Sequence, residues 1–165
     1  MSTIRGGFIQ PLVDDGHQVA VTLTPTAADW LGEIGETDRI ASLTGLPVRS
    51  TPRRPSEPRP HPEVDVYVAA PLTANSVAKL ALGLADNEAL TVLCESIATV
   101  PMIVFPRINA AHAHQPAWPD HLDRLRTAGV ELIYGEHVWP LAEPRAAGPR
   151  DLPWTAILTM LKSRC

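Results

Sequence analysis

One stretch of the chain combines a short apolar run, a polar turn and a helical pattern, an arrangement that can bind a ligand. The run Val66–Ala70 holds β-branched, aromatic and small residues and is bounded by Pro71, which predicts a buried strand. Thr73 and Asn75 follow, and both residue types are good helix N-caps. Because a helix N-terminus presents free backbone N–H groups, an open α/β sheet usually binds anions at such a turn. The stretch therefore predicts a ligand site.

Strand and helix patterns alternate along the rest of the chain. Apolar runs predict three further strands, at Val19–Leu23, Met102–Phe105 and Glu131–Tyr134. Apolar residues at helical spacing predict helices at Phe8–Asp15, Pro25–Leu31, Asp38–Leu43, Glu88–Ala98, His121–Ala128 and Pro153–Lys162. Thr24 is expected to cap the second of these, with Pro25 at its first position. Alternating strands and helices predict an α/β fold with a parallel sheet and helices on both faces.

Composition limits the classes of function. A chain of 165 residues is most simply one domain that is large enough to bury a core. Its net charge of −4 argues against nucleic acid or an anionic membrane as partner. Only Cys94 and Cys165 are present, which excludes a disulfide framework, and no apolar run has the length of a membrane span. We expect a soluble cytoplasmic protein.

A proline-rich segment, Pro47–Pro62, separates the two halves of the pattern. Its prolines rule out a helix and make a central strand unfavourable, so we expect an extended loop. Its four arginines (Arg49, Arg53, Arg54 and Arg59) could meet an acidic ligand. The alternative is a solvated basic loop, which is the more common role of such a segment.

The beginning of the chain lacks an expected element. A doubly wound fold normally starts with a strand whose turn into the first helix binds phosphate. Here only Thr3 and Ile4 stand before Arg5-Gly6-Gly7, which is too short for a central strand. Either the fold lacks that strand or the sequence starts late. We expect the late start, that is, an N-terminally truncated domain.

The segment Pro71–Asn87 resembles the signature of the homo-oligomeric flavin-containing cysteine decarboxylases, the family of phosphopantothenoylcysteine decarboxylase-like flavoproteins. That signature is a strand ending in Ala-Pro, then Ser/Thr-Ala-Asn-Ser/Thr, a Lys four residues after the Asn, and Ala-Asp-Asn closing the helix. All of these features are present here, in Ala70-Pro71, Thr73-Ala74-Asn75-Ser76, Lys79 and Ala85-Asp86-Asn87. Weaker similarity extends from about Gly6 to Tyr134, so the proline-rich tail after Gly135 falls outside it.

The resemblance implies a Rossmann-like three-layer α/β/α domain that binds FMN between the subunits of a trimer, with trimers often assembled into a dodecamer. This FMN-binding domain would span residues 1–135, and residues 136–165 would pack on it. Thr24 would lie near the flavin phosphate and Asn75 at the reaction centre. The remaining cofactor contacts would come from Pro71, Leu72, Thr73, Ala74 and Pro106. The alternative for Thr24 and Asn75 is plain helix capping.

Two motifs of the decarboxylating members are altered in this sequence. Those members carry Pro-x-Met-Asn-x-x-Met-Trp after the next strand. The corresponding run, Pro106–Ala113, keeps the Pro and Asn but has Ile and His in place of the methionines and lacks the Trp. The family's catalytic His precedes the strand by about eight residues, counted from the position of Asp65. That position holds Glu57, and the nearest histidine is His61.

The resemblance also implies a reaction. In the family, the flavin oxidises a cysteine thiol to a thioaldehyde, which eases loss of the adjacent carboxylate, and the protein supplies orientation and a proton acceptor. Imidazole is the natural acceptor, so His61, His112 and His114 are possible substitutes. Arg107, beside Asn109, could pair with a substrate carboxylate. The alternative for each is a solvent-facing loop residue. His112 and His114 could also form a metal pair, but without a third ligand nearby in sequence we expect no metal.

We therefore predict an FMN-dependent, decarboxylase-like lyase that acts on a small-molecule or peptide thiol. Its catalytic candidates are Asn75, Asn109 and His112, and its substrate-binding candidates are Arg107 and Asn109. Two alternatives remain. One is a flavin prenyltransferase, which shares a related fold, although Lys79 and Ala85–Asn87 favour the decarboxylases. The other is a non-catalytic regulatory or assembly subunit of the same fold.

Overall fold

The computed structural model describes residues 3–146, 148 and 150–164. The chain forms two compact units. We call Val64–Leu84 with Leu93–Cys165 the sheet unit, and Ser2–Glu63 with Ala85–Val92 the helical unit. Cys165, which we expect to be free, lies outside the described residues. The predicted domain division at residue 135 stays a prediction.

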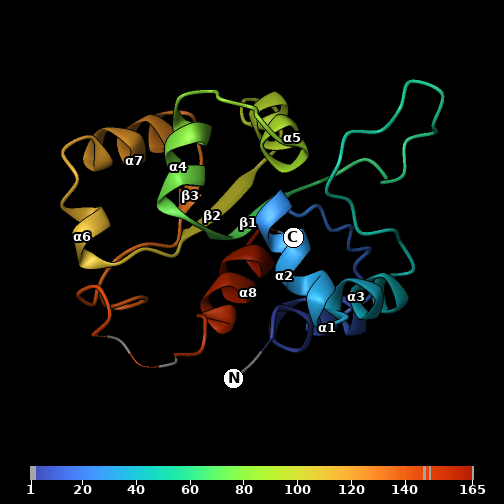
Figure 1. Cartoon of the computed structure of the whole chain (residues 1–165), viewed down its shortest axis with the longest axis horizontal. Coiled ribbons are helices and arrows are strands. Elements are labelled where there is room, and N and C mark those ends of the chain that lie inside the picture. Colours follow the sequence, from blue (N-terminus) through green and yellow to red (C-terminus); the bar gives the residue numbers. More distant parts are fainter. Residues whose placement is uncertain (1–2, 147, 149, 165) are drawn as a thin grey trace. The chain divides into compact units, whose positions relative to one another are not determined.

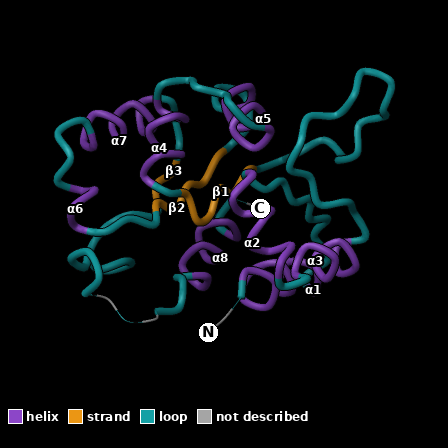
Figure 2. The backbone as a smooth tube through the Cα atoms, in the orientation of Figure 1, coloured by secondary structure: helices purple, strands orange, loops and turns teal. Residues whose placement is uncertain are grey.

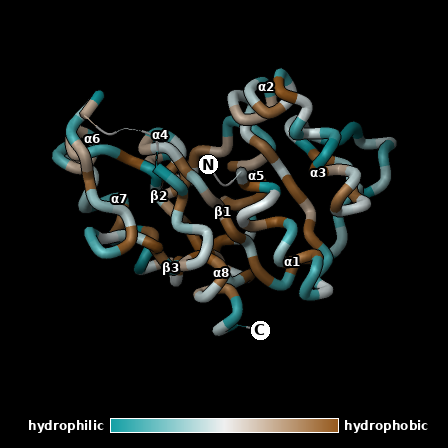
Figure 3. Tube along the Cα trace, turned by 90° about the horizontal axis from the view of Figure 1, so that it is seen from below, coloured by the Kyte–Doolittle hydropathy of each residue, from teal (hydrophilic) through white to brown (hydrophobic). Residues whose placement is uncertain are grey.

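The sheet unit is built on three parallel strands, β1 (Tyr67–Leu72), β2 (Met102–Pro106) and β3 (Glu131–Leu132), in the order β1-β2-β3. Because β2 lies between two partners, all five of its residues are buried. Figure 3 shows the hydrophobic character of β1 and β2 in brown. The parallel sheet and the α/β fold class are confirmed.

Four helices accompany the sheet: α4 (Ala74–Ala81), α6 (Ala110–Ala113), α7 (Trp118–Thr127) and α8 (Trp154–Lys162). Helices α4 and α7 contact each other, while α8 contacts β2. Figure 1 shows α4 and α7 above the strands and α8 below them. Helices α4, α7 and α8 turn an apolar stripe inward, as amphipathic helices do in layered folds; in α8 the buried residues are Trp154, Ile157 and Leu161.

The helical unit begins with a π-helical segment, η1 (Arg5–Ile9), continued by α1 (Gln10–Asp14). Helices α2 (Pro25–Glu33) and α3 (Glu36–Thr44) follow. The predicted helices here are confirmed: α2 begins at Pro25 as predicted, whereas the first helical segment and α3 begin before the predicted Phe8 and Asp38. Helix α5 (Glu88–Ser96) begins with residues of this unit, and the Asn87 side chain accepts a hydrogen bond from the backbone N–H of Leu90 at 3.1 Å.

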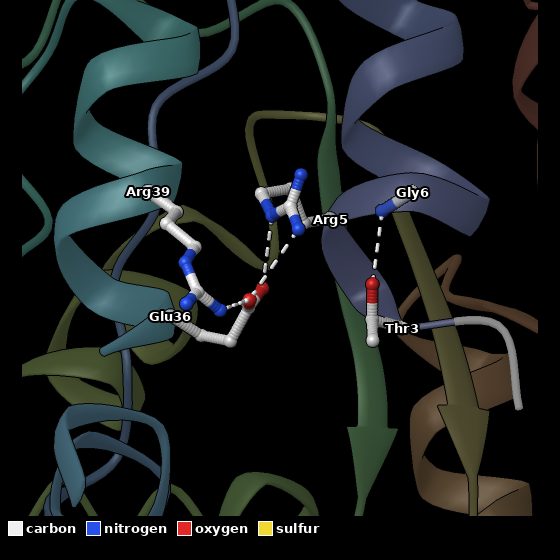
Figure 4. Close-up of polar contacts among 5 residues, drawn as sticks. All are labelled: Thr3, Arg5, Gly6, Glu36 and Arg39. Carbon is white, nitrogen blue, oxygen red and sulfur yellow. Dashed lines mark hydrogen bonds and ion pairs between the residues drawn. The ribbon is translucent and has the colours of Figure 1, made fainter. Parts of the chain in front are cut away.

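A buried carboxylate holds part of the helical unit together. Glu36, only 4% exposed, accepts hydrogen bonds from Arg5 Nε at 3.0 Å and from Arg39 Nη1 at 2.8 Å (Figure 4). The hydrogen bond from Arg5, followed by that from Arg39, lowers the pKa of Glu36 against the opposing effect of burial. Because a buried charge is tolerated only when it is paired, the two guanidinium groups keep this carboxylate in the fold.

The proline-rich segment is an extended loop, as predicted. Figure 2 shows the chain between α3 and β1 as loop. Arg49 Nη2 donates to the carbonyl of Thr51 at 2.9 Å, and Arg53 Nη1 donates to the carbonyl of Glu57 at 3.0 Å. These two arginines therefore satisfy carbonyl groups of their own loop.

Several predicted boundaries are wrong. The strand predicted at Glu131–Tyr134 is limited to β3 (Glu131–Leu132). Pro71 does not end the first strand, because β1 continues to Leu72; as an edge strand of the described sheet, β1 tolerates a residue without an N–H. Residues 19–23 form no strand but a single bridge between Thr22 and Arg49, since Pro47, two residues before Arg49, lacks the N–H group that would extend the ladder in that direction. Helix α4 ends at Ala81, so Ala85–Asn87 lies beyond it and leads into α5.

None of the helices in the described ranges is long and apolar enough to cross a bilayer.

Candidate functional site

The turn after β1 is organised by its own residues. The Thr73 side chain caps α4 by accepting a hydrogen bond from the backbone N–H of Ser76 at 3.3 Å. Pro71, Thr73 and Asn75 are exposed, whereas Leu72 is only 7% exposed and anchors the turn in the core. The turn therefore presents a pyrrolidine ring and an amide to solvent at the carboxyl end of a parallel strand, where open α/β sheets bind ligands, while the Thr73 hydroxyl also donates to the Ser76 hydroxyl at 3.3 Å.

The turn after β2 also carries a cap, which at the same time orients a histidine. Asn109 Oδ1 accepts a hydrogen bond from the backbone N–H of His112 at 3.0 Å, and the ring Nδ1 of His112 lies 2.9 Å from the same oxygen. Because a carboxamide oxygen only accepts, this contact assigns the proton to Nδ1. The neutral ring then keeps its lone pair on Nε2, on an exposed side chain. His112 is thus arranged to accept a proton.

A backbone hydrogen bond joins the two turns. The N–H of Arg107 donates to the carbonyl oxygen of Leu72 at 2.8 Å, directly beyond the last pair of the β1–β2 ladder, Leu72 with Pro106. The turn Pro71–Asn75 and the turn Pro106–Asn109 therefore lie side by side. Arg107 itself is exposed. The structure brings together six of the predicted residues in the sheet unit, namely Pro71, Leu72, Thr73, Pro106, Arg107 and Asn109, with Ala74, Asn75 and His112 on the helices that follow.

Thr24 belongs to the helical unit. Its hydroxyl caps α2 by accepting from the N–H of Ala27 at 3.4 Å, and Pro25 follows at the start of the helix, both as predicted. The same unit contains a cavity of about 320 Å³. None of the predicted site residues lines it; the lining residues are Leu23, Ala28, Gly32, Gly35, Thr37, Asp38, Val48 and Ser50.

The other candidate groups have simpler surroundings. His61 Nε2 lies 2.8 Å from the carbonyl oxygen of Pro47, so His61 donates there within its own loop. His114 is exposed at the end of α6. Cys94 is half-buried, and burial raises the pKa of its thiol, which disfavours the reactive thiolate. Within the described part of the chain, no three metal-binding side chains come together.

Comparison with known proteins identifies the family to which this chain belongs. A family model described as flavoprotein matches residues 3–161 of the chain. The protein belongs to the flavoprotein family. As a member of that family, the chain resembles two curated proteins. Phosphopantothenoylcysteine decarboxylase of Arabidopsis thaliana is 28% identical over 137 residues, which cover 81% of this chain. The coenzyme A biosynthesis bifunctional protein of Haemophilus influenzae is 30% identical over 123 residues, or 70% of this chain. The matches span 66% and 29% of these relatives' own lengths, less than two thirds of either.

Solved structures of other flavoproteins share the fold. The FMN-dependent cysteine decarboxylase TvaF of thioviridamide biosynthesis has a TM-score of 0.70 and 27% identity, with 99% of this chain and 91% of that chain covered. A PPC decarboxylase mutant complexed with pantothenoylaminoethenethiol has a TM-score of 0.64 and 21% identity, with 96% and 91% covered. The predicted Rossmann-like fold is therefore confirmed, and the resemblance to the flavin-containing cysteine decarboxylases is confirmed with it.

Reasoning from the sequence missed one group of residues beside the turn after β2. Trp139 and Ala142, in the proline-rich tail, are hydrogen-bonded to the backbone of Ile108 and Ala110. The resemblance recognised in the sequence ends at about Tyr134, although the family model extends to residue 161, so no motif pointed to the tail. The available signal was composition, since four of the chain's few aromatic residues are Trp, and two of them, Trp139 and Trp154, stand in this tail.

Proposed function

We propose that this protein binds FMN and catalyses oxidative decarboxylation of a cysteine-type thiol, either a small molecule or a peptide. The observation that carries the proposal is the backbone hydrogen bond from Arg107 to Leu72. It holds the turn Pro71–Asn75, which we call the flavin-type turn, next to the turn that bears Asn109, Arg107 and the oriented imidazole of His112. Family membership and the FMN-dependent neighbour TvaF support a flavin cofactor. FMN in particular is part of the proposal.

The residues of the first turn suit a flavin. Its isoalloxazine ring needs an apolar surface and hydrogen-bonding groups along one polar edge. The exposed ring of Pro71 offers the first, and the Thr73 hydroxyl and Asn75 amide offer the second. Leu72 and Ala74 contribute backbone at the start of α4, and Pro106 closes the neighbouring strand. Thr24, at the start of α2, is the proposed contact to the phosphate, since a helix N-terminus favours an anion.

The second turn supplies groups for the substrate. Bound FMN would take up two electrons from the cysteine side chain, and this oxidation eases loss of the adjacent carboxylate as carbon dioxide. Arg107 would pair with that carboxylate and hold it near the flavin-type turn. The Nε2 of His112 would accept the thiol proton, because Asn109 keeps the other ring nitrogen protonated. Asn75 would orient the reacting group between the two turns.

Optical titration tests the cofactor before the reaction. FMN should be added to purified protein while the flavin absorbance and fluorescence are followed. A shifted and quenched flavin spectrum is expected, and weaker binding is expected after the change Asn75→Ala. Protein that leaves the flavin spectrum unchanged at every concentration would contradict the enzymatic proposal and support the non-catalytic subunit.

Carbon dioxide release tests the reaction. The FMN-loaded protein should be incubated with phosphopantothenoylcysteine, with L-cysteine and with a peptide that ends in cysteine. Release of carbon dioxide with loss of 46 mass units from the thiol compound, which is about the mass of carbon dioxide plus two hydrogens, is expected for oxidative decarboxylation. A prenylated flavin formed from a prenyl phosphate instead would identify the prenyltransferase alternative.

We also propose self-association, as a trimer or a dodecamer. Two large apolar side chains in neighbouring turns of the α2 region, Trp30 and Ile34, are 69% and 60% exposed, which supports a partner surface there. Light scattering coupled to gel filtration measures the mass directly. A monomer at micromolar concentration would contradict the proposed self-association. A cytoplasmic location stays a prediction.

A further inference from the structure

Two residues of the proline-rich tail, Trp139 and Ala142, are hydrogen-bonded to the turn after β2. Trp139 Nε1 donates to the carbonyl oxygen of Ile108 at 3.2 Å, and the N–H of Ala110 donates to the carbonyl oxygen of Ala142 at 2.9 Å. Trp139 lies 31 residues from Ile108 in the sequence. The backbone of this turn is therefore fixed by a remote segment, in addition to its hydrogen bond with Leu72.

Trp139 is itself held tightly. Its side chain is 7% exposed and meets Phe105 of β2 edge to face, with ring centroids 5.6 Å apart. The guanidinium carbon of Arg150 lies 3.9 Å from the Trp139 ring centroid, within cation–π range. Arg150 Nη1 also donates to the carbonyl oxygen of Pro140 at 2.7 Å. We call Trp139, Pro140, Ala142 and Arg150 the brace.

The brace acts on the residues that alternate with the candidate substrate contacts. Ile108 and Ala110 are 6% and 8% exposed and face the protein interior, whereas Arg107 is exposed and Asn109 is half-buried. Because Arg107 and Asn109 are bonded directly to Ile108 and Ala110 along the chain, restraining the backbone at Ile108 and Ala110 also restrains the positions from which the Arg107 and Asn109 side chains project. Any looseness at Ile108 would move both of those side chains.

We propose that Trp139 and Arg150 are positioning residues of the thiol-substrate site. This inference rests on the proposed function, because the groups it positions are Arg107, Asn109 and, through Asn109, His112. Trp139 acts through its indole N–H, and Arg150 acts by covering the Trp139 ring and tethering Pro140. None of the interactions described for the brace involves residues of the flavin-type turn. The brace is therefore expected to affect substrate binding and to leave cofactor binding unchanged.

The change Trp139→Phe tests the proposal, because it keeps an aromatic ring and removes the N–H. Trp118→Phe is the matched control: Trp118 is 4% exposed, and its Nε1 donates to the Tyr134 hydroxyl at the same distance of 3.2 Å. With FMN-loaded enzyme and phosphopantothenoylcysteine, KM is expected to rise about three- to tenfold in Trp139→Phe, the effect of one lost hydrogen bond. The FMN dissociation constant should stay within about twofold, and Trp118→Phe should change neither value.

Two further variants examine Arg150. Arg150→Lys keeps a cation over the ring and should retain most of the wild-type KM, whereas Arg150→Met keeps a similar side-chain length without charge and should raise KM. If Trp139→Phe changes FMN binding as much as KM, or if Trp118→Phe raises KM equally, the effect is general destabilisation and the positioning role is overturned.

Hydrogen–deuterium exchange separates this inference from the proposed function. Trp139→Phe should speed exchange in peptides that cover residues 106–113 and spare those that cover residues 67–82, and Trp118→Phe should not speed exchange at residues 106–113. Wild-type protein that converts no thiol, combined with this exchange pattern, would remove the proposed function and leave the brace in place. Unchanged exchange at residues 106–113 would overturn the brace even in an active enzyme.

Discussion

The turns after β1 and β2 occupy equivalent places at neighbouring strand ends, yet they are held in different ways. The first is fixed mainly by its own sequence: Leu72 is buried and Thr73 caps the eight-residue helix α4. The second leads into α6, a helix of only four residues, and depends on Trp139 and Ala142 from the tail. The turn after β1 is thus stabilised by residues within it, whereas the turn after β2 depends on residues at least 31 positions further along the chain.

This difference explains where the family resemblance is strong and where it weakens. The residues that shape the first turn are adjacent in sequence, so they form a continuous motif from Pro71 to Asn75. The residues that shape the second turn are divided between Pro106–His112 and the tail, and the conformation of each part depends on the other. Substitutions in one part can then be accommodated by the other.

The largest expected effect is on turnover, after His112→Ala. Loss of the proposed proton acceptor should lower kcat by about 10²- to 10⁴-fold, the usual contribution of a positioned general base. The FMN affinity of the same variant should be unchanged, because FMN is proposed to bind at the turn after β1 and His112 lies after β2. His114→Ala, two residues away on the exposed side of α6, is the control and should retain full turnover. Equal losses from both histidines, or a loss of FMN binding, would remove the functional distinction between the two turns.

A second effect concerns stability, after Trp139→Ala. Removing the buried indole leaves a cavity against Phe105 and an unpaired carbonyl on Ile108. A decrease of about 3–5 kcal/mol in the free energy of unfolding is expected. Urea denaturation followed by circular dichroism measures it. A decrease below about 1 kcal/mol would mean that the second turn is stable without the tail, as the first turn is.

A third variant, Glu36→Gln, tests a charged cluster outside both turns. Because the folded-state pKa of Glu36 is lowered, its carboxylate stabilises the fold above its ordinary pKa, and this stability is lost as the pH falls through the lowered value. Glu36→Gln should therefore cost about 1–3 kcal/mol at pH 7, from weakened hydrogen bonds to Arg5 and Arg39. Urea denaturation should show the difference from wild type shrinking at acid pH. A difference independent of pH would show that the charge is not involved.

The smallest effect separates the two caps. Thr73→Ala should cost about 0.5–2 kcal/mol of stability, because α4 loses its N-cap, and Thr73→Ser should restore most of it. Asn109→Ala should cost less stability, since α6 is short, but should reduce thiol turnover by releasing His112. Parallel urea denaturation and kinetic assays measure both. If Thr73→Ala and Asn109→Ala lose the same stability and Asn109→Ala does not reduce turnover, the two caps have the same role and the two turns differ only in the lengths of the helices that follow them.

The sequence determined much of the fold because many of its signals are local. Periodic apolar residues predicted the helices and the fully buried strand β2, and Thr24 with Pro25 marked the start of α2. The proline-rich loop followed from the geometry of proline itself. The motif from Pro71 to Asn75 indicated a flavin-type turn, since all of its residues are neighbours along the chain.

The tertiary structure decided the features that depend on pairing between distant residues. Residues 19–23 have a strand-like sequence, but only Thr22 finds a bridge partner in Arg49, so no strand forms. The orientation of His112 comes from its side-chain contact with Asn109 in the folded turn. The brace joins Trp139 to Ile108 across 31 positions, and no local preference encodes that distance. Hydrogen bonds between remote segments form only once the chain has folded, and they therefore leave no short-range pattern in the sequence.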